Sequence, residues 1–371
     1  MRKSTQAQPA RLYNCPMSIH VLYDGWDLAY RPHSPAALHL LAILAHLPAD
    51  VQASIALPKA VTFALPENAS AVIEETSHTA GDKLAWQQNK LAKVFDQVGA
   101  DLLHLTQAQA SLFSNIPTVV SPTGYGNASR SGGFAARLGE ALGKGGMSTV
   151  QAILWPSDLP KPEDVNNLYE LPPIVHPDFE PYQHYHPPEI PELELPETYL
   201  LYHGAEDEGT LAQLLQRWSW GAGAIGEYYP LYLVGLGEGA KEYVERMMPD
   251  ESVRCLAVIA PDSLAKVYQG CSALYHLGPV SPWGGPIRHM LACARPVVGL
   301  ETPEMDALVG PAAFLVPDGD ERAFASAMIS IVVNQEIYEP VMKAAYTRSE
   351  PWRNNDYGEK LVEVYTDVLG K

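Results

Sequence analysis

The sequence predicts an α/β protein with two doubly wound parallel sheets, one in each half of the chain. Short apolar runs alternate with amphipathic segments throughout, as in "SIHVLYDG" at residues 18–25 and "TYLLYHG" at residues 198–204. A proline-dense stretch without apolar periodicity separates the two halves. Strands that alternate with helices pair in parallel through crossover connections, and 371 residues are enough for two such domains.

In the first half, local chemistry marks where helices begin and end. Ser34 followed by Pro35 predicts a helix start, because a serine side chain caps free N–H groups and proline fits the first helical turn. We expect that helix to run to His46. Residues 83–99, "KLAWQQNKLAKVFDQVG", predict an amphipathic helix that ends at Gly99. The other strands of this half are predicted at residues 53–58, 100–105 and 117–124.

The second half repeats the alternation of strands and helices. Strands are predicted at residues 198–204, 230–239, 253–259, 272–278 and 312–317, and helices at residues 210–218, 240–248, 262–270 and 320–334. In open α/β sheets, ligands bind beyond the carboxyl ends of the strands. The loops at residues 203–209, 235–239 and 278–286 are therefore expected to surround one crevice that faces the first half.

The charge balance limits the classes of partner. Against 25 Lys and Arg stand 43 Asp and Glu, which gives a formal net charge of −18. Such a surface repels phosphate backbones and anionic lipids, so nucleic-acid binding and strong membrane association are not expected. The longest apolar stretch, residues 35–48, is shorter than the about 20 residues that cross a bilayer. Residues 1–16 lack the apolar core of a secretory signal, and we interpret them as an extension on a cytoplasmic protein.

Neither cysteines nor histidines predict a metal site. The four cysteines are widely spaced and form no C-x-x-C pair, so free buried thiols are expected. His176, His184 and His186 lie in or beside the proline-rich stretch, where a solvated linker is the favoured interpretation and a metal site the alternative. No metal and no bound cofactor is therefore expected.

Several ordered segments of the second half resemble the donor-binding domain of group 1 (family-4-type) glycosyltransferases. They are "YLLYHG", "PLYLVGLGEG", "DSLAKVYQGCSALYHLG", "GGPIRHMLACARPVVG", "MDALVGPAAFLVPDGDERAFASAM" and the closing "PWRNNDYGEKLVEVYTDVL". In the first half the resemblance is looser and rests on "YDG", "PTVVSPTG" and "PPIVHPDF". Enzymes of this family retain the anomeric configuration of the sugar and have the GT-B fold, in which two Rossmann-like domains face each other across a cleft.

The resemblance implies a division of the chain into five parts. These are an N-terminal extension at 1–16, an acceptor-side domain at 17–176, a proline-rich linker at 177–197, a donor-side domain at 198–350 and a C-terminal helix at 351–371 that crosses back onto the first domain.

This sequence departs from the family at the positions that carry charge. The two glutamates of the family's loop align with Ser281 and His289, and "LACARPVV" pins that alignment. The arginine and lysine that neutralise the donor diphosphate are replaced by the segment with Glu206, Asp207 and Glu208. Like charges in contact repel by as much as unlike charges attract, so these carboxylates disfavour a diphosphate.

Two further departures lie in the first domain. The family's glycine-rich turn is replaced by Ser34 and Pro35, and proline offers no N–H to an anion. A histidine that is common after "PTVV" falls on Thr123.

The resemblance nevertheless implies a set of candidate site residues. The catalytic candidates are Ser281, His289 and Thr123. The donor-binding candidates are Gly204, Glu206, Gly235, Trp283, Gly284, Gly285, Pro286, Ile287 and Arg288. The acceptor-side candidates are Asp24, Gly25, Ser34 and Gly124.

Three of these residues have two interpretations each. Arg288 is either the cation that replaces the family's basic pair or a solvated side chain that pairs with the acids at 206–208. Trp283 either stacks on a base or sugar, or plugs an empty cleft. His289 either binds a ribose hydroxyl or is a half-buried polar residue at a helix start.

Two functions follow as hypotheses. The first is a glycosyltransferase with an altered donor site, which transfers a sugar from a nucleotide-sugar donor to a carbohydrate acceptor. The alternative is a catalytically inactive relative that acts as a binding or assembly subunit, and a metabolite-binding protein that closes by hinge motion is a third. An active enzyme needs a cation for the diphosphate, for which Arg288, Lys266 and Lys241 are the candidates. A second copy of the chain or a partner transferase is the expected protein partner.

Overall fold

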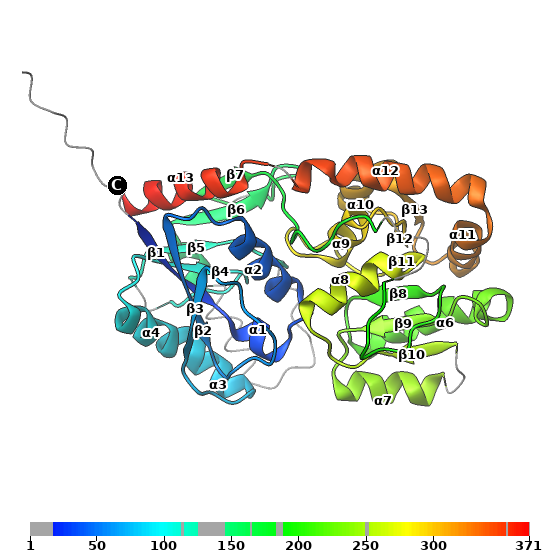
Figure 1. Cartoon of the computed structure of the whole chain (residues 1–371), viewed down its shortest axis with the longest axis horizontal. Coiled ribbons are helices and arrows are strands. Elements are labelled where there is room, and N and C mark those ends of the chain that lie inside the picture. Colours follow the sequence, from blue (N-terminus) through cyan, green and yellow to red (C-terminus); the bar gives the residue numbers. More distant parts are fainter. Residues whose placement is uncertain are drawn as a thin grey trace, which may run out of the picture.

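The computed structural model describes residues 18–112, 115–124, 145–163, 165–182, 188–248, 252–353 and 355–370. These residues form two α/β domains that lie side by side along the long axis of the molecule (Figure 1). Each domain is built on one parallel sheet with helices on both faces. The predicted fold class is therefore confirmed.

The first sheet has β1 (Ile19–Asp24) near its centre. Its order is β3 (Ala69–Ile73), β2 (Val51–Leu57), β1, β4 (Leu102–Leu105), β5 (Thr118–Val120), β6 (Ala152–Pro156) and β7 (Leu168–Leu171), with every pair parallel. Successive residues of β1 point to opposite faces, so Val21 enters the core below α2 (Pro35–His46) while Leu22 enters the core below α4 (Leu91–Val98). Both faces of the central strands are thus buried.

The helices of the first domain begin where local chemistry predicts. Ser34 Oγ accepts a hydrogen bond from the Ala37 amide at 3.2 Å, which caps α2 as expected. The shorter helices of this domain are α1 (Trp26–Tyr30), α3 (Ala80–Ala85), the π-helix η1 (Trp86–Lys90) and the 3-10 helix η2 (Met147–Thr149).

The helix predicted at residues 83–99 is not continuous. Its middle is the π-helical turn η1, between α3 and α4. The wider turn places Trp86 so that its Nε1 donates to Asp24 Oδ1 at 2.9 Å, a contact that links the helix to the end of β1. The predicted end at Gly99 is correct, because this glycine adopts a left-handed conformation with φ 65°.

The second sheet is centred on β8 (Leu200–His203) and β11 (Ala273–His276). Its order is β10 (Val253–Cys255), β9 (Leu231–Val234), β8, β11, β12 (Val297–Leu300) and β13 (Ala313–Val316), again all parallel. The helices are α6 (Glu208–Ile225), α7 (Glu238–Met247), α8 (Pro261–Gly270), α9 (Pro286–Ala292), α10 (Pro303–Val309), the 3-10 helix η3 (Gly310–Ala312), α11 (Glu321–Val333) and α12 (Gln335–Arg353). Residues of α6 and α11 fill one face of the sheet, and residues of α8, α9 and α12 fill the other.

The proline-rich linker is partly buried, in contrast to the solvated linker predicted. Phe179 and Ile190 are each at most 5% exposed and join the core that covers β8 and α9. These apolar side chains anchor a segment whose composition alone suggests an extended coil. His176 Nδ1 lies 3.4 Å from Asp178 Oδ2, while His184 and His186 lie outside the described residues.

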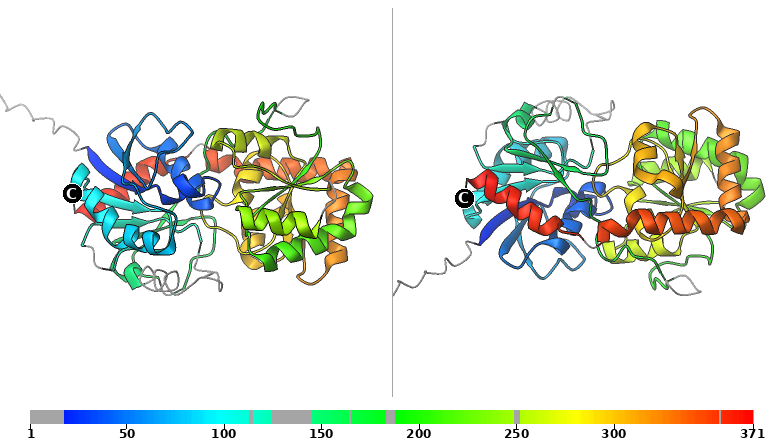
Figure 2. Two further views of the ribbon diagram at one scale, coloured as in Figure 1. Left: turned by 90° about the horizontal axis from the view of Figure 1, so that it is seen from below. Right: turned by 90° about the horizontal axis from the view of Figure 1, so that it is seen from above.

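The last helix, α13 (Tyr357–Leu369), packs against the first domain. Figure 2 shows α12 and α13 running end to end across both domains. Tyr365 Oη lies 3.1 Å from Tyr23 Oη and 2.6 Å from His104 Nδ1. Trp352 still belongs to α12 and packs in the core of the second domain, so the turn between the two helices lies a few residues later than the sequence suggests.

None of the helices in the described ranges is long and apolar enough to cross a membrane.

Candidate site at the domain joint

The carboxyl ends of both sheets meet at the joint between the domains. Gly235 ends β9 with φ 80°, and a Cβ atom added there would lie 3.2 Å from His203 Nε2 and 3.5 Å from His33 Cβ. Since His33 belongs to the first domain, the glycine turn of the second domain touches the first domain directly. Only a residue without a side chain fits this position at positive φ.

His33 and His203 are buried on either side of this turn. His33 Nε2 donates to the carbonyl oxygen of Ile259 at 2.7 Å, which ties the first domain to the second. His203 Nδ1 and Tyr268 Oη are 2.6 Å apart. Burial lowers the pKa of His33, and it lowers the pKa of His203 to about 3, so both rings are neutral at pH 7. The motif analysis did not select either histidine, since both lie outside the aligned glutamate positions.

Ser281 and Thr123 are brought together across the joint. Ser281 Oγ is within hydrogen-bonding distance of the carbonyl oxygens of Thr123 and, at 2.6 Å, Trp283. A serine hydroxyl has one proton, which these two acceptors share. The hydroxyl of Thr123 donates to Thr106 O at 2.7 Å. Both catalytic candidates therefore lie at the joint, with their hydroxyl protons directed to backbone carbonyls.

Trp283 fills the joint and offers no exposed face. Its side chain is 0% exposed, its Nε1 donates to Leu154 O of the first domain at 3.1 Å, and its ring stacks on His39 with centroids 4.9 Å apart. Gly284 has φ 61°, and an added Cβ would lie 2.8 Å from His39 Cβ. The structure supports the interpretation of Trp283 as a plug and contradicts the alternative of a stacking platform for a ligand.

Arg288 is a buried ion-pair partner, which corrects both sequence-based interpretations. Its guanidinium is 0% exposed and donates to both oxygens of Asp158 in the first domain, at 2.9 and 2.7 Å. Its Nε donates to Pro282 O at 3.0 Å, and its charge lies 5.0 Å from the ring centre of Trp352. Burial acts to raise the pKa of Asp158, but the Arg288 charge outweighs it and holds that pKa below its usual range. Arg288 is neither solvated nor free for a phosphate.

His289 is the middle residue of the seven-residue helix α9 and is fully buried. Its ring centroid is 4.1 Å from that of Phe179, and neither ring nitrogen makes a hydrogen bond within the described ranges. Burial lowers the pKa of this imidazole well below its usual value. The residue is thus more enclosed than the half-buried polar residue that was one of the two interpretations.

The remaining candidates of this loop have structural contacts. Gly285 caps α9, and an added Cβ would lie 2.8 Å from Ser281 Cβ. Pro286 and Ile287 begin that helix and are buried. Gly204 faces Tyr202, whose hydroxyl would lie 2.9 Å from an added Cβ. The two glycines allow the neighbouring side chains of Ser281 and Tyr202 to pack closely against the backbone.

The acids after β8 are bonded to backbone amides. Glu206 Oε2 accepts from the Gly237 amide at 2.7 Å, and Glu206 Oε1 lies 3.8 Å from Arg31 Nη2 of the first domain. Asp207 caps α6 by accepting from the amide of Thr210 at 3.0 Å and from its hydroxyl at 2.8 Å. Arg31 was not among the candidate cations, because its partner is 175 positions away and no local pattern indicates the pair.

Among the residues predicted for the acceptor side, Asp24 is the central polar residue. Its Oδ1 accepts from the Trp26 amide at 3.0 Å and from Trp86 Nε1 at 2.9 Å. Burial raises the pKa of Asp24 to about 6, against the two hydrogen bonds that lower it. Gly25 follows with no room for a side chain, since an added Cβ would lie 2.6 Å from Leu57 Cδ2. Gly124 is exposed at the last described position before residue 125.

A polar network that the sequence analysis did not select includes Asp27 and Lys83, whose charges act on Asp24. Gln107 Nε2 donates to Asp27 Oδ2, Lys83 Nζ donates to Gln107 Oε1 at 3.3 Å, and Gln87 Nε2 donates to Gln109 Oε1 at 2.6 Å. These side chains come from the ends of β1 and β4 and from the region of the π-helical turn. Trp86 and Gln87 both belong to the π-helical turn, which brings them to this edge of the sheet. The sequence gives no pattern that indicates such a turn.

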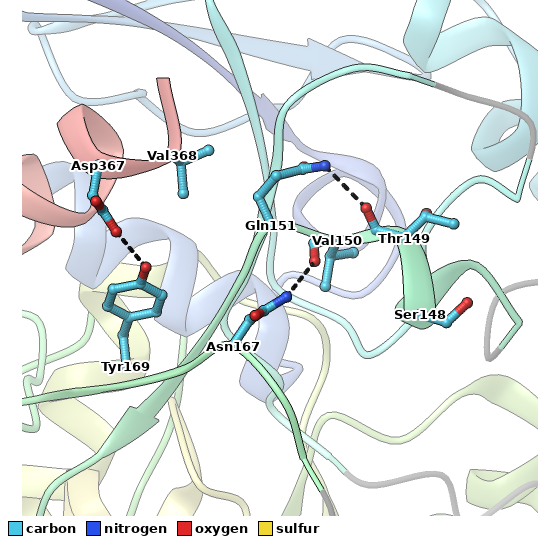
Figure 3. Close-up of a pocket in the computed structure, with 8 residues that line it drawn as sticks. All are labelled: Ser148, Thr149, Val150, Gln151, Asn167, Tyr169, Asp367 and Val368. Atoms are coloured by element: carbon cyan, nitrogen blue, oxygen red, sulfur yellow. Dashed lines mark hydrogen bonds between the residues drawn. The ribbon is translucent and has the colours of Figure 1, made fainter. Parts of the chain in front are cut away.

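Of two surface hollows, one lies away from this strand-end joint and the other lies between the two domains. One, of about 400 Å³, lies at the amino ends of β6 and β7. There Asn167 Nδ2 donates to Val150 O at 3.4 Å and Tyr169 Oη donates to Asp367 of α13 (Figure 3). The other, of about 470 Å³, lies between α2, the linker and the start of α8. Over the ranges that the structure describes, no three His, Cys, Asp or Glu side chains converge as metal ligands.

One protein-family model matches part of the second domain. Residues 213–334 match the family model described as "Glycosyl transferases group 1", which confirms the predicted resemblance over this segment. No curated protein matches the chain.

Solved structures of similar fold cover nearly the whole chain. A sucrose-phosphate synthase (tll1590) from Thermosynechococcus elongatus has a TM-score of 0.67 and 14% identity, and the match covers 95% of this chain and 99% of that one. WaaG, a glycosyltransferase involved in lipopolysaccharide biosynthesis, has a TM-score of 0.65 and 13% identity over 93% and 99% of the two chains. Anabaena Alr3699/HepE, in complex with UDP and glucose, has a TM-score of 0.64 and 14% identity over 94% and 100%. These likenesses confirm the GT-B fold.

Proposed function

We propose that this chain is a glycosyltransferase that transfers a sugar from a nucleotide-linked donor to a hydroxylated acceptor, with both held at the domain joint. The observation that carries the proposal is the convergence of the two sheets' carboxyl ends, where Ser281 meets Thr123 and Gly235 meets His33. Ligands of open α/β sheets bind at such ends. The match to group 1 glycosyltransferases and the likeness to HepE, whose structure holds UDP and glucose, support a nucleotide-sugar donor.

We assign the donor to the second domain and the acceptor to the first. The start of α7 presents backbone N–H groups without a side-chain cap from the helix itself, and such helix starts bind diphosphates. Asp24 and the amides of its glutamine neighbours offer hydrogen-bond partners for the hydroxyl groups of a sugar acceptor. With a pKa of about 6, the Asp24 carboxyl is mainly ionised at pH 7 and is able to accept a hydroxyl hydrogen bond.

We further propose that transfer retains the anomeric configuration and needs no metal ion. Retaining transferases of this fold need few catalytic side chains, because the leaving diphosphate assists its own departure once its charge is neutralised. Preorganised donors aimed at developing charge supply that neutralisation. The protein must therefore provide cations and amides at the donor phosphates.

A panel of nucleotide sugars tests the proposal. Thermal shift with UDP-, GDP- and ADP-sugars should identify one nucleotide that stabilises the protein, by about 2.7 kcal/mol at 100 times its Kd. Release of the nucleoside diphosphate with an added sugar acceptor should follow for that donor alone. An Arg31→Ala variant should lose the shift, whereas Lys161→Ala, whose partner is Glu170 on the far edge of the first sheet, should keep it. If no member of the panel shifts the melting temperature, the transferase proposal fails.

One observation favours the alternative of a catalytically inactive binding or assembly subunit. The two aligned glutamate positions hold Ser281, bonded to backbone carbonyls, and His289, buried against Phe179. The panel separates the two functions, because an inactive subunit gives neither nucleotide release nor a shift with any donor.

A further inference from the structure

We infer that Glu206 is an autoinhibitory residue that occupies the donor phosphate site. When a donor displaces Glu206, Arg31 is released and is the cation of that site. This inference rests on the proposed function and concerns how the same site is regulated. In this inference the missing cation comes from the first domain, whereas in the family it comes from the second.

The Glu206 carboxylate makes both contacts that a phosphate would make, one with a backbone amide and one with a guanidinium. Its Oε2 accepts the Gly237 amide at 2.7 Å, at the N-cap of α7, where no side chain of the helix itself caps the first turn. Its Oε1 faces Arg31 across the joint at 3.8 Å. An anion between a helix-start amide and a guanidinium is the arrangement that proteins use to bind phosphate.

Two of the three other candidate cations are already paired. Arg288 is held by both oxygens of Asp158, and Lys241 Nζ bonds Glu238 Oε1 at 2.9 Å on its own helix. Arg31 is paired only loosely in comparison, because its side chain is 54% exposed and that of Glu206 is 40% exposed. Exposed ion pairs contribute little stability, so an incoming ligand displaces this one at small cost.

The joint also holds a buried histidine without a partner among the described residues. His289 is fully buried, yet neither of its ring nitrogens has a hydrogen-bond partner in the part of the chain that the structure describes. Its ring centroid lies 6.0 Å from that of Tyr268, whose hydroxyl bonds His203, and His203 borders Gly235. Buried polar atoms without partners are uncommon in folded proteins. This series of contacts connects His289 to the turn that carries the Gly237 amide.

Replacement of the Glu206 carboxylate by a diphosphate is favourable because the two anions carry different charges. Glu206 brings one negative charge to the Gly237 amide and Arg31, whereas a diphosphate brings at least two. A nucleoside diphosphate therefore displaces the Glu206 carboxylate, whereas weakly binding anions do not. In its displaced position, Glu206 no longer neutralises Arg31, which is then free to compensate the charge of the leaving diphosphate.

Calorimetry with inorganic pyrophosphate and with UDP, in metal-free buffer, tests the inference. Glu206→Ala should bind both at least tenfold more tightly than the natural protein. Glu208→Ala is the matched control, since it removes an equal charge two positions further on, and its affinity should change less than threefold. Adding Arg31→Ala to Glu206→Ala should abolish the gain.

Two outcomes overturn the inference. One is a Glu206→Ala variant that binds no more tightly than the Glu208→Ala control. The other is a double variant that keeps the full gain, because Arg31 is then not the cation. Failure of the proposed function is distinguishable, since pyrophosphate and UDP would bind as described while no nucleotide sugar releases its nucleoside diphosphate.

Discussion

Arg288 and Asp158 form a bidentate ion pair that joins the two domains, with Nη1 to Oδ2 at 2.9 Å and Nη2 to Oδ1 at 2.7 Å. Asp158 follows β6 of the first domain and Arg288 lies in α9 of the second. The arginine is 0% exposed, so removal of either partner leaves a buried charge uncompensated. The pair is part of what keeps the joint closed.

We therefore predict that Arg288→Ala lowers the free energy of unfolding by about 3 to 5 kcal/mol. Urea denaturation at pH 7 measures this loss. Lys161→Ala is the control, because its ion pair with Glu170 is exposed and should contribute little. Equal losses in the two variants would show that the buried pair carries no special stability.

Gly284→Ala should open the joint. An added methyl group would lie 2.8 Å from His39 Cβ and 2.9 Å from His39 N, and φ 61° is strained for alanine. The radius of gyration from small-angle scattering should increase, and the free energy of unfolding should fall. Gly223→Ala is the matched control: it lies exposed in α6 with no atom near its added Cβ, and should raise helix stability by up to about 1 kcal/mol. An unchanged radius for Gly284→Ala would contradict the packing described for this loop.

Asp24→Asn should stabilise the protein near neutral pH. Burial raises the pKa of Asp24 from 3.8 to about 6, so between these values the native state holds a proton that the unfolded state has released. The natural protein consequently loses stability as pH rises from about 4 to 6. The asparagine keeps an oxygen for Trp26 and Trp86 without the charge, and should be more stable at pH 7 by roughly 3 kcal/mol. Denaturation at pH 4, 5, 6 and 7 should show this difference growing with pH; a constant difference would mean that Asp24 does not titrate as stated.

His104 should make the protein sensitive to acid. Burial lowers its pKa from 6.5 to about 3, while its two nitrogens lie 2.6 Å from Tyr365 Oη and 2.9 Å from Ser121 Oγ. Below pH 6.5 the unfolded state binds a proton that the native state refuses, so stability falls by about 1.4 kcal/mol per pH unit for this residue. His104→Asn should flatten the dependence of unfolding free energy on pH between 6 and 4 by that amount. A slope identical to that of the natural protein would exclude His104 as a contributor.

The parts of the fold predicted from the sequence are those with local causes. The start of α2 follows from Ser34 and Pro35, and the end of α4 follows from Gly99, because caps and left-handed turns are determined within a few residues. The strands β3, β6 and β7 were missed. The edge strands β3 and β7 are short and mostly not buried, so they lack a clear apolar period. β6 is fully buried, and a five-residue apolar run has no period that separates a strand from a helix. The π-helical turn also has no periodic signature of its own.

The site was predictable only in outline. Alignment through "LACARPVV" placed Ser281 beside the joint, but the partners of the charged residues could not be read from the sequence. Arg288 finds Asp158 130 positions away, and Glu206 finds Arg31 175 positions away. Such pairs depend on how the two domains dock, and docking leaves no pattern in either segment alone.

The course of the chain determines how the two domains can move. It passes between them twice, once through the linker and once from α12 to α13. Asn355, between those two helices, donates through Nδ2 to Pro173 O, a few residues before the linker, at 2.9 Å. Figure 1 shows the α12–α13 passage along one side of the molecule. Two connections joined at one place favour hinge rotation about an axis near that place. Ser281 with Thr123 and Arg31 with Glu206 are contacts between the domains, so such a rotation would break both together.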